Sequence, residues 1–429
     1  FAGRLGEFDS ILAEHFLRAE DWERATHYLL RAAEGAAHLY ALAEARSHYA
    51  RALDALARLP DDPQERAAGH RRRAEMLIHL VSVSFVADSP EQNLARMAEA
   101  ESLLTADPAL AAENAVLLAR VHYWMGRCHY YSNRPLQAIQ YYRQVLAVAE
   151  QTGDPELLAI PSATMGRALM GQGRFPQARA LLAQALDPLE RVGNLPEWVL
   201  TQAYFGGALA ALGEVQAGLE AGQRALERAR ASHNLTGESA SQIILGFSYF
   251  HGGDYAAMLQ AARAAVQVAE QSGDRLYLYF GHGFCAWAQT HLGRARDAIA
   301  SMNRCDEVGR SMGGRLLIGD WIAAIKAEIA RGAGLPVQAA ALAERAVAVA
   351  REAGGLFAEG MAQHTWALAL AALDPPRLDE AEIHLAAGLQ ALETGQSRPL
   401  IARLHATWAA LARARGDLPE PREFFVPPA

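Results

Sequence analysis

The chain has 429 residues, a formal net charge of −8 and a pI near 6.0, and 51% of its residues are hydrophobic. This charge attracts neither nucleic acid nor an anionic membrane surface, so we expect no direct nucleic-acid partner and no membrane contact. A chain of this length is too long for one ordinary hydrophobic core, but a helical repeat array can extend along one axis by adding units. The excess of Ala and Leu over β-branched residues favours helices.

The first segment, residues 1–112, is predicted to form less regular helical hairpins. Apolar periodicity predicts helices over residues 11–19, 22–33, 40–59 and 65–86. The acidic run Asp61-Asp62 lies in the last break between them, before Pro63. Since a proline there prevents one continuous helix from presenting both carboxylates on one face, we interpret the run as a linker rather than a metal motif.

Regular repeats of forty residues occupy residues 113–355. Small residues recur at this interval, at Gly126, Gly166, Gly206, Gly246 and Ala286. Seven residues after each comes a turn former, at Asn133, Gly173, Gly213, Gly253 and Gly293. A second break closes each unit, at Gly153-Asp154, Gly193-Asn194, His233-Asn234, Gly273-Asp274 and Gly313-Gly314. Each unit is therefore predicted to be two antiparallel helices.

Local chemistry supports this assignment. The turn residues supply a positive φ or end a helix, and Pro135 and Pro176 stand where the second helix begins, where no backbone donor is needed. The small residue in each first helix is expected where the two helices cross too closely for a larger side chain. Residues 356–417 predict a last hairpin, turning at Asp374-Pro375-Pro376, and a capping helix over 400–415. Residues 418–429 form a Pro-rich tail, which we expect to be frayed.

The repeat unit resembles the tetratricopeptide repeat (TPR). That family carries a small residue at the crossing, an Ala near the start of the second helix and a bulky residue four positions later, as in Gly166, Ala178 and Leu182, or in Gly126, Ala138 and Tyr142. The resemblance implies an all-α, right-handed α-α superhelix of about ten hairpins plus a capping helix. The middle repeats depart from the pattern, with Gly218 and Met258 in place of the Ala, and Gly222 and Ala262 in place of the bulky residue.

The opening residues carry a second resemblance. LAEHFLRAEDWERATHYLLRAAEGA at 12–36, followed by LAEARSHYARAL at 42–53, is similar to the start of the TPR sensor array in STAND regulators, the class of the maltose-regulon activator. The resemblance implies a larger parent protein with an upstream nucleotide-binding module and, in some cases, a cyclase or kinase domain. ATP and magnesium would bind that module, and this chain would contact it intramolecularly.

Catalytic signatures are missing from this chain. Lys326 is the only lysine and lies mid-helix in Ile325-Lys326-Ala327, so no phosphate-binding loop can form and no cofactor is expected here. Cys128, Cys285 and Cys305 lack zinc-site spacing and indicate a reducing, cytoplasmic location. His122 and His129 could share a helix face, but without a third ligand we favour packing over metal binding. We expect no enzyme activity.

A binding surface remains. In TPR superhelices the first helices line a concave groove, and carrying that register over residue by residue gives a candidate ligand-binding set. Its members are Tyr123, Arg127, Tyr130, Arg167, Phe247, Phe250, Phe280, Trp287, Trp321, Glu328, Arg331 and His364. Aromatics beside arginines can hold a peptide, a carboxylate or an aromatic ligand. The alternative is that several of these rings fill the interfaces between repeats.

The leading hypothesis is a non-catalytic sensor domain that binds a protein, peptide or small effector in this groove and passes a change of curvature to an upstream ATPase or output domain. The second is a constitutive scaffold that binds a partner's peptide. A helical-repeat enzyme is a remote third hypothesis, because paired carboxylates, metal spacing and a nucleophile motif are all missing. A phosphate-binding loop upstream of Phe1 in the full gene would favour the sensor.

Overall fold

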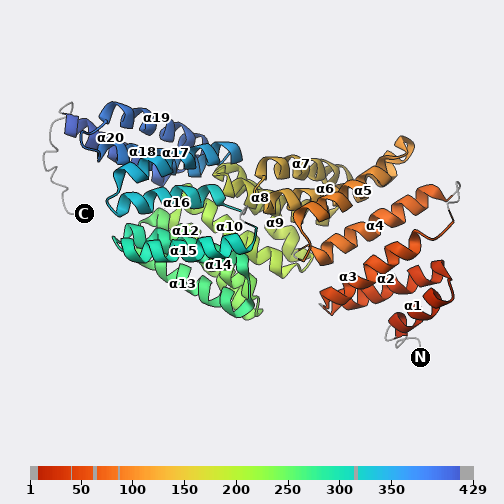
Figure 1. The fold of residues 1–429 in the computed structure, drawn as a ribbon. Coiled ribbons are helices and arrows are strands. Elements are labelled where there is room, and N and C mark those ends of the chain that lie inside the picture. Colours follow the sequence, from red (N-terminus) through yellow and green to blue (C-terminus); the bar gives the residue numbers. More distant parts are fainter. Residues whose placement is uncertain (1–7, 40, 61–64, 86, 314–316, 416–429) are drawn as a thin grey trace. The chain divides into compact units, whose positions relative to one another are not determined.

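The computed structural model describes residues 8–39, 41–60, 65–85, 87–313 and 317–415. Over these residues the chain forms twenty α-helices and contains no strand, arranged as successive antiparallel hairpins of a TPR-like solenoid (Figure 1). The predicted all-α class is confirmed. The Asp61-Asp62-Pro63 run and the Pro-rich tail lie outside the described residues.

The chain divides into two compact units. The N-terminal unit comprises residues 1–132 and 137–161, and the C-terminal unit comprises residues 133–136 and 162–429. The division at residues 161 and 162 falls inside one helix, α8, which carries Pro161 in its interior.

The N-terminal unit is built from seven helices, a 3-10 turn and the first part of α8. They are α1 (Asp9–Arg18), α2 (Trp22–His38), α3 (Leu42–Leu56), α4 (Arg66–Ser84), α5 (Pro90–Thr105), η2 (Pro108–Leu110), α6 (Ala111–Tyr131), α7 (Pro135–Thr152) and α8 (Pro155–Gly171). Buried residues such as Leu29, Tyr49 and Met97 form one continuous core. The sequence did not predict α5, although Ser89 and Gln92 form a capping box at its start.

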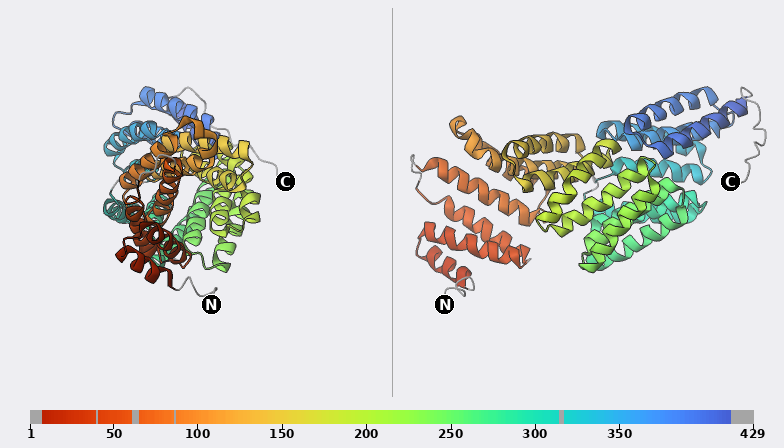
Figure 2. Two further views of the ribbon diagram at one scale, coloured as in Figure 1. Left: turned by 90° about the vertical axis from the view of Figure 1, so that its right-hand side faces the viewer. Right: turned by 180° about the vertical axis from the view of Figure 1, so that it is seen from behind.

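The C-terminal unit continues the hairpins to the last described helix. It contains the rest of α8, then α9 (Phe175–Arg191), α10 (Leu195–Ala211), α11 (Val215–Ala231), α12 (Leu235–Gly252), α13 (Tyr255–Ser272), α14 (Arg275–His291), α15 (Ala295–Ser311), α16 (Gly319–Gly332), α17 (Pro336–Ala353), α18 (Leu356–Ala371), α19 (Leu378–Gly395) and α20 (Arg398–Arg415). The stacked pairs from α10 to α19 can be followed from behind in the right-hand view of Figure 2.

The turns between helices follow the expected chemistry. All ten described turn positions of the regular repeats have a positive φ, eight as Gly and two as Asn133 and His233. The next residue often caps the following helix, as where Asn234 accepts a hydrogen bond from the backbone N–H of Gly237 and Asp254 from that of Ala257. Turn and cap together set the direction of each hairpin.

The close helix crossing expected at the small residues is found at Gly126, Gly166 and Gly206, but not at Gly246, where an added Cβ would lie 3.6 Å from its nearest neighbours. A Cβ added to Gly126 would lie 2.5 Å from the ring of Tyr142, and one added to Gly166 would lie 2.7 Å from Leu182. The departure at Gly218 has a structural reason, because a Cβ on Gly206 would lie 2.5 Å from the carbonyl oxygen of Gly218. Two glycines therefore let these backbones meet with no side chain between them.

Within the C-terminal unit, the array turns back on itself. The indole Nε1 of Trp321 in α16 donates to the carbonyl of Gly171 at the end of α8, over 2.8 Å. The side-chain amide of Gln172 donates to the carbonyl of Ala353, and the backbone carbonyl of Gln172 accepts from the backbone N–H of Leu356. Segments at least 150 residues apart in the sequence are thereby joined.

Candidate functional site

A cluster of aromatic rings fills the inner side of the C-terminal unit. Its centroid separations include 5.2 Å for Phe247 and Trp321, 4.6 Å for Trp321 and Phe357, and 3.9 Å for Phe250 and Trp287. His251 lies among these rings, and burial lowers its pKa to about 3, so it is neutral at pH 7. The rings of the cluster are buried and pack directly against one another between the helices that carry them.

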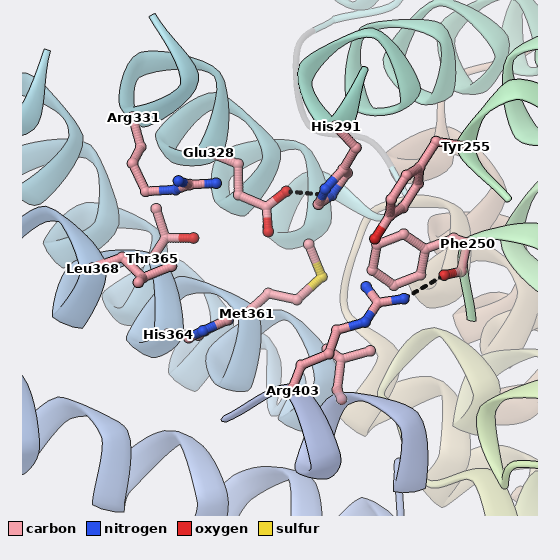
Figure 3. Close-up of a pocket in the computed structure, with 11 residues that line it drawn as sticks. Phe250, Tyr255, His291, Glu328, Arg331, Met361, His364, Thr365, Leu368 and Arg403 are labelled. Carbon is pink, nitrogen blue, oxygen red and sulfur yellow. Dashed lines mark hydrogen bonds and ion pairs between the residues drawn. The ribbon is translucent and has the colours of Figure 1, made fainter. Parts of the chain in front are cut away.

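A cavity of about 80 Å³ adjoins this cluster (Figure 3). Its polar lining comes from Tyr255 of α13, His291 of α14, Glu328 and Arg331 of α16, His364 and Thr365 of α18, and Arg403 of α20. Its apolar lining comes from Phe250 of α12, Met361 and Leu368 of α18, and Leu400 of α20. Six helices therefore contribute to one site, and several lining side chains are half-buried, which leaves the cavity open to solvent.

Glu328 is the acidic group of the cavity and is only 7% exposed. Its Oε2 accepts a 2.7 Å hydrogen bond from Nε1 of Trp287 and lies 3.3 Å from Nε2 of His291. Burial acts to raise the pKa of Glu328, but His291, Arg331 and Trp287 outweigh burial and hold the pKa below its usual range. The carboxyl group is therefore ionised at neutral pH.

Two arginines also line the cavity. Arg331 stands one helical turn after Glu328 on α16, and its Nε has no hydrogen-bond partner among the described residues. Arg403 reaches in from α20, donates from Nη2 to the carbonyl of Phe250 over 2.6 Å, and stacks 4.6 Å above the Phe250 ring. Arg403 and Phe250 are 153 positions apart in the sequence.

His364 borders the same cavity and pairs with Thr407 of α20, Nε2 to Oγ1 at 2.8 Å. Burial lowers its pKa to about 4, so the ring is neutral at pH 7. On the opposite side, the rings of Tyr255 and His291 stack 4.3 Å apart. The lining thus combines the carboxylate of Glu328 with the guanidinium groups of Arg331 and Arg403.

Four of the twelve residues predicted from the repeat register meet in this cavity: Phe250, Glu328, Arg331 and His364. Trp287 stands directly behind it, fully buried, and contacts Glu328 through its indole N–H. Together with Trp287, these residues come from four helices, α12, α14, α16 and α18.

Other predicted residues of the C-terminal unit lie elsewhere. Phe247 and Trp321 are inside the aromatic cluster, 0% and 4% exposed. Phe280 is 4% exposed and packs against the rings of Tyr277 and Tyr279. Arg167 is also buried, donating to Glu197 over 2.8 Å and to Thr164 over 3.2 Å. For these side chains, the structure shows packing or internal pairing.

The remaining three belong to the N-terminal unit. Arg127 donates to the hydroxyl of Tyr123 over 3.0 Å, and its guanidinium lies among four rings, from 4.9 Å to Phe85 to 5.8 Å to Tyr123. Tyr130 is 9% exposed and meets Tyr131 edge to face. Arg127 thus already occupies an aromatic cage made by its own unit.

Sequence reasoning missed the other lining residues, which are Tyr255, His291, Met361, Thr365, Leu368, Leu400 and Arg403. The interpretation considered only the inner faces of first helices near the crossing, whereas Tyr255 begins a second helix and Arg403 lies on the capping helix. His291 had a usable signal, since it follows Trp287 by four residues and therefore lies on the same helix face.

Among the described residues, no three His, Cys, Asp or Glu side chains lie close enough together to hold a metal ion. None of the described helices combines the length and the apolar character that crossing a bilayer requires.

Comparison with known proteins places the fold. A tetratricopeptide repeat profile matches residues 117–191, and no curated protein matches the chain. A solved Rap protein complexed with competence and sporulation factor is 13% identical, with a TM-score of 0.57, covering 91% of this chain and 99% of its own. The Rap conjugation gene regulator of plasmid pLS20, solved with a Phr peptide, is 10% identical with a TM-score of 0.57, covering 86% and 96%.

A STAND protein with a tetratricopeptide repeat sensor from Pyrococcus horikoshii is also similar, at 12% identity and a TM-score of 0.44, over 86% of this chain and 54% of its own. At that score the likeness carries no argument. At these identities the two Rap structures show the fold alone, a TPR-like solenoid.

Proposed function

We propose that this chain is a non-catalytic peptide-binding repeat domain and that the cavity of its C-terminal unit contacts the bound segment. The observation that carries the proposal is the convergence of Glu328, Arg331 and Arg403 from two helices on one solvent-reached cavity beside packed aromatic rings. Buried Glu328 and half-buried Arg331 and Arg403 cost stability unless they are well paired, and the Nε of Arg331 has no hydrogen-bond partner in the part of the chain that the structure describes. Binding supplies a reason for such an arrangement.

The lining suits a peptide. The Glu328 carboxylate can accept hydrogen bonds from the N–H groups of a peptide backbone, and the guanidinium groups of Arg331 and Arg403 can donate to its carbonyl oxygens. Phe250 and Tyr255 add aromatic faces for an apolar side chain. The similar Rap structure solved with a Phr peptide supports this choice by analogy of fold.

The test is retention of peptides by the immobilised chain. A randomised octapeptide library is passed over the wild type, over Leu368→Trp and over Val349→Trp, and the retained peptides are measured by mass spectrometry. Leu368 lines the cavity, whereas Val349 is 38% exposed on α17 and does not. We expect retention by the wild type and by Val349→Trp, and loss in Leu368→Trp. No retention by the wild type, or equal retention by all three chains, would overturn the proposal.

A second candidate is that the domain serves as the sensor of a larger STAND-type signalling protein. The opening residues 12–36 and 42–53 favour it, because they are similar to the start of such sensor arrays. Binding in the cavity would then shift the curvature of the array by preferring one state. The sequence of the full gene decides the matter: an upstream phosphate-binding loop supports the sensor, and its lack favours a constitutive scaffold.

A further inference from the structure

We infer that the last described helix, α20, is a movable lid of the cavity, which detaches as one unit and thereby controls when a peptide segment can reach the residues beneath it. This inference rests on the proposed function for its purpose, because it names what regulates access to that same site. The movement itself is a property of the fold and can be measured without any peptide.

The cavity is too small for a peptide segment while α20 is in place. A single water occupies roughly 10–15 Å³ of such volume, so about 80 Å³ holds only a few atoms. Leu400 and Arg403 of α20 form one part of the lining, next to Phe250 of α12 and Met361 of α18. Removing α20 would add the space that this helix occupies to the cavity. One wall must therefore move before several residues can lie here.

Of the helices that line the cavity, α20 has the smallest buried part. Three of its 18 residues are buried, Leu400, Leu404 and Leu411. By comparison, nine of 14 residues are buried in α16 and ten of 16 in α18. Because the free energy that holds a helix in place grows with the apolar area that it buries, α20 is the wall whose detachment costs least.

Two polar contacts hold the cavity side of α20. Arg403 donates to the carbonyl of Phe250 over 2.6 Å (Figure 3), and Oγ1 of Thr407 lies 2.8 Å from Nε2 of His364. The Phe250 carbonyl also accepts from the backbone N–H of Gly253, so it keeps a partner when Arg403 leaves. His364 is half-buried even with α20 in place, so its ring nitrogen can then bond to water. Detachment therefore leaves neither acceptor nor ring stranded in a dry site.

The turn between α19 and α20 favours movement at this place. Gln396 has a φ of 55°, a left-handed conformation that is unfavourable for a residue with a side chain. Ser397 is completely buried, and its hydroxyl has no hydrogen-bond partner within the described ranges. Release of the turn would relieve both costs. At its far end α20 is held to α19 by surface ion pairs from Arg415 to Asp379 and Glu382, which contribute little.

The experiment measures how often the cavity is uncovered. Met361→Cys places a thiol in the lining, at a side chain that is 1% exposed. Fluorescein-5-maleimide is too large for the cavity and reacts there only when a wall has moved. Cys285 of α14 is the internal reference, because it is buried and does not line the cavity. We expect the introduced thiol to be labelled roughly tenfold or more faster than Cys285, as read by mass spectrometry of the digested protein.

Equal labelling rates at the two positions would mean that the cavity opens only when the unit unfolds, and would overturn the lid. Since the labelling uses no peptide, that result would leave the proposed function standing. Conversely, fast labelling together with no retention of any peptide library would keep the lid and overturn the proposed function.

Variants assign the opening to α20. Thr407→Val removes the contact with His364 and should speed labelling at position 361 roughly fivefold, since one hydrogen bond contributes a factor of that order. Labelling of Cys285 should not change. The matched control is His405→Gln, an exposed position on the same helix, which should leave both rates as they are. The same rate at position 361 in the Thr407→Val and His405→Gln chains would show that α20 is not the wall that moves.

Hydrogen exchange of the wild type covers the case in which the substitution at position 361 prevents folding. The amides of α20 from Leu400 to Leu411 should exchange together, roughly tenfold or more faster than those of α18. Fast exchange confined to the end near Arg415 would indicate fraying of a helix terminus and would overturn the inference. Exchange of the whole of α20 as slow as that of α18 would overturn it as well.

Discussion

Nε1 of Trp287 donates a 2.7 Å hydrogen bond to Oε2 of Glu328, joining α14 to α16 across 41 residues. Both residues are buried, Trp287 completely and Glu328 to all but 7%. The hydrogen bond from the indole N–H holds the Glu328 carboxylate in position. That carboxylate is the negative charge of the cavity. This contact therefore connects the packing of two repeats with the properties of the candidate site.

Replacing Glu328 should destabilise the fold, and the loss should depend on whether the new side chain still accepts a hydrogen bond from Trp287. Glu328→Leu leaves the Trp287 N–H without an acceptor and Arg331 without its counter-charge, so we expect a loss of about 3–5 kcal/mol in the free energy of unfolding. Glu328→Gln keeps an acceptor and should lose about 1–2 kcal/mol. Urea denaturation followed by circular dichroism measures both.

The matched control for these variants is Glu344→Leu on α17, where the glutamate is exposed. Its effect should stay within about 0.5 kcal/mol, as for other exposed positions. If Glu328→Leu proved no more destabilising than Glu344→Leu, the pairing of Glu328 with Trp287 would have no energetic role.

A Gly→Ala substitution should lower the stability of the fold at a close helix crossing and raise it on an open helix face. Gly206→Ala would place a Cβ 2.5 Å from the carbonyl oxygen of Gly218, so we expect destabilisation of about 1–3 kcal/mol. Gly35→Ala in α2 meets no atom within 4 Å and should stabilise its helix by about 0.5–1 kcal/mol. Thermal melts of both variants give the comparison, and a stabilising Gly206→Ala would show that α10 and α11 cross less closely.

Asp320 should make stability depend on pH. Burial raises its pKa to about 7, and its carboxyl lies so close to Gly355 that a Cβ there would stand 2.1 Å from Oδ2. Between pH 4 and pH 7 the folded state keeps a proton on this group that the unfolded state has lost. The contribution of Asp320 is therefore fully present at low pH and is lost as pH rises through this window.

The variant Asp320→Asn should remove this dependence. Its stability relative to the wild type should rise by up to about 1.4 kcal/mol for each pH unit between pH 4 and pH 7, and then level off. Urea titrations of both chains at several pH values measure the difference, in which the titration of all other groups cancels. A difference that does not change with pH would mean that Asp320 is ionised in the folded chain.

The hairpin pattern could be predicted because its determinants are local. A positive φ at Gly173 or Gly253, a cap at Asn234 and a close crossing at Gly166 each depend on a few neighbouring residues. Helix α5 has the same kind of local determinants, because Ser89, Pro90 and Gln92 mark a helix start. Its presence could therefore also have been predicted from the sequence.

The candidate site was predictable only in part because it depends on curvature. The repeat register places Phe250, Glu328 and His364 on the inner side, but the degree of closure is a sum of small rotations over many repeats. That sum decides whether a ring such as Phe247 lines a groove or fills a core. Arg403 depends on it most, since its contact with Phe250 requires the whole array between them.

The most direct test of the central claim, that peptides bind at this cavity, is site-specific photo-crosslinking. The photoreactive residue p-benzoylphenylalanine is placed at position 368 on the cavity, or at position 349 on the exposed side of α17, and each chain is irradiated with the randomised octapeptide library. We predict peptide adducts at position 368 and none above background at position 349, read by mass spectrometry of the digested protein. Adducts at position 349 alone, or at both positions equally, would contradict the account.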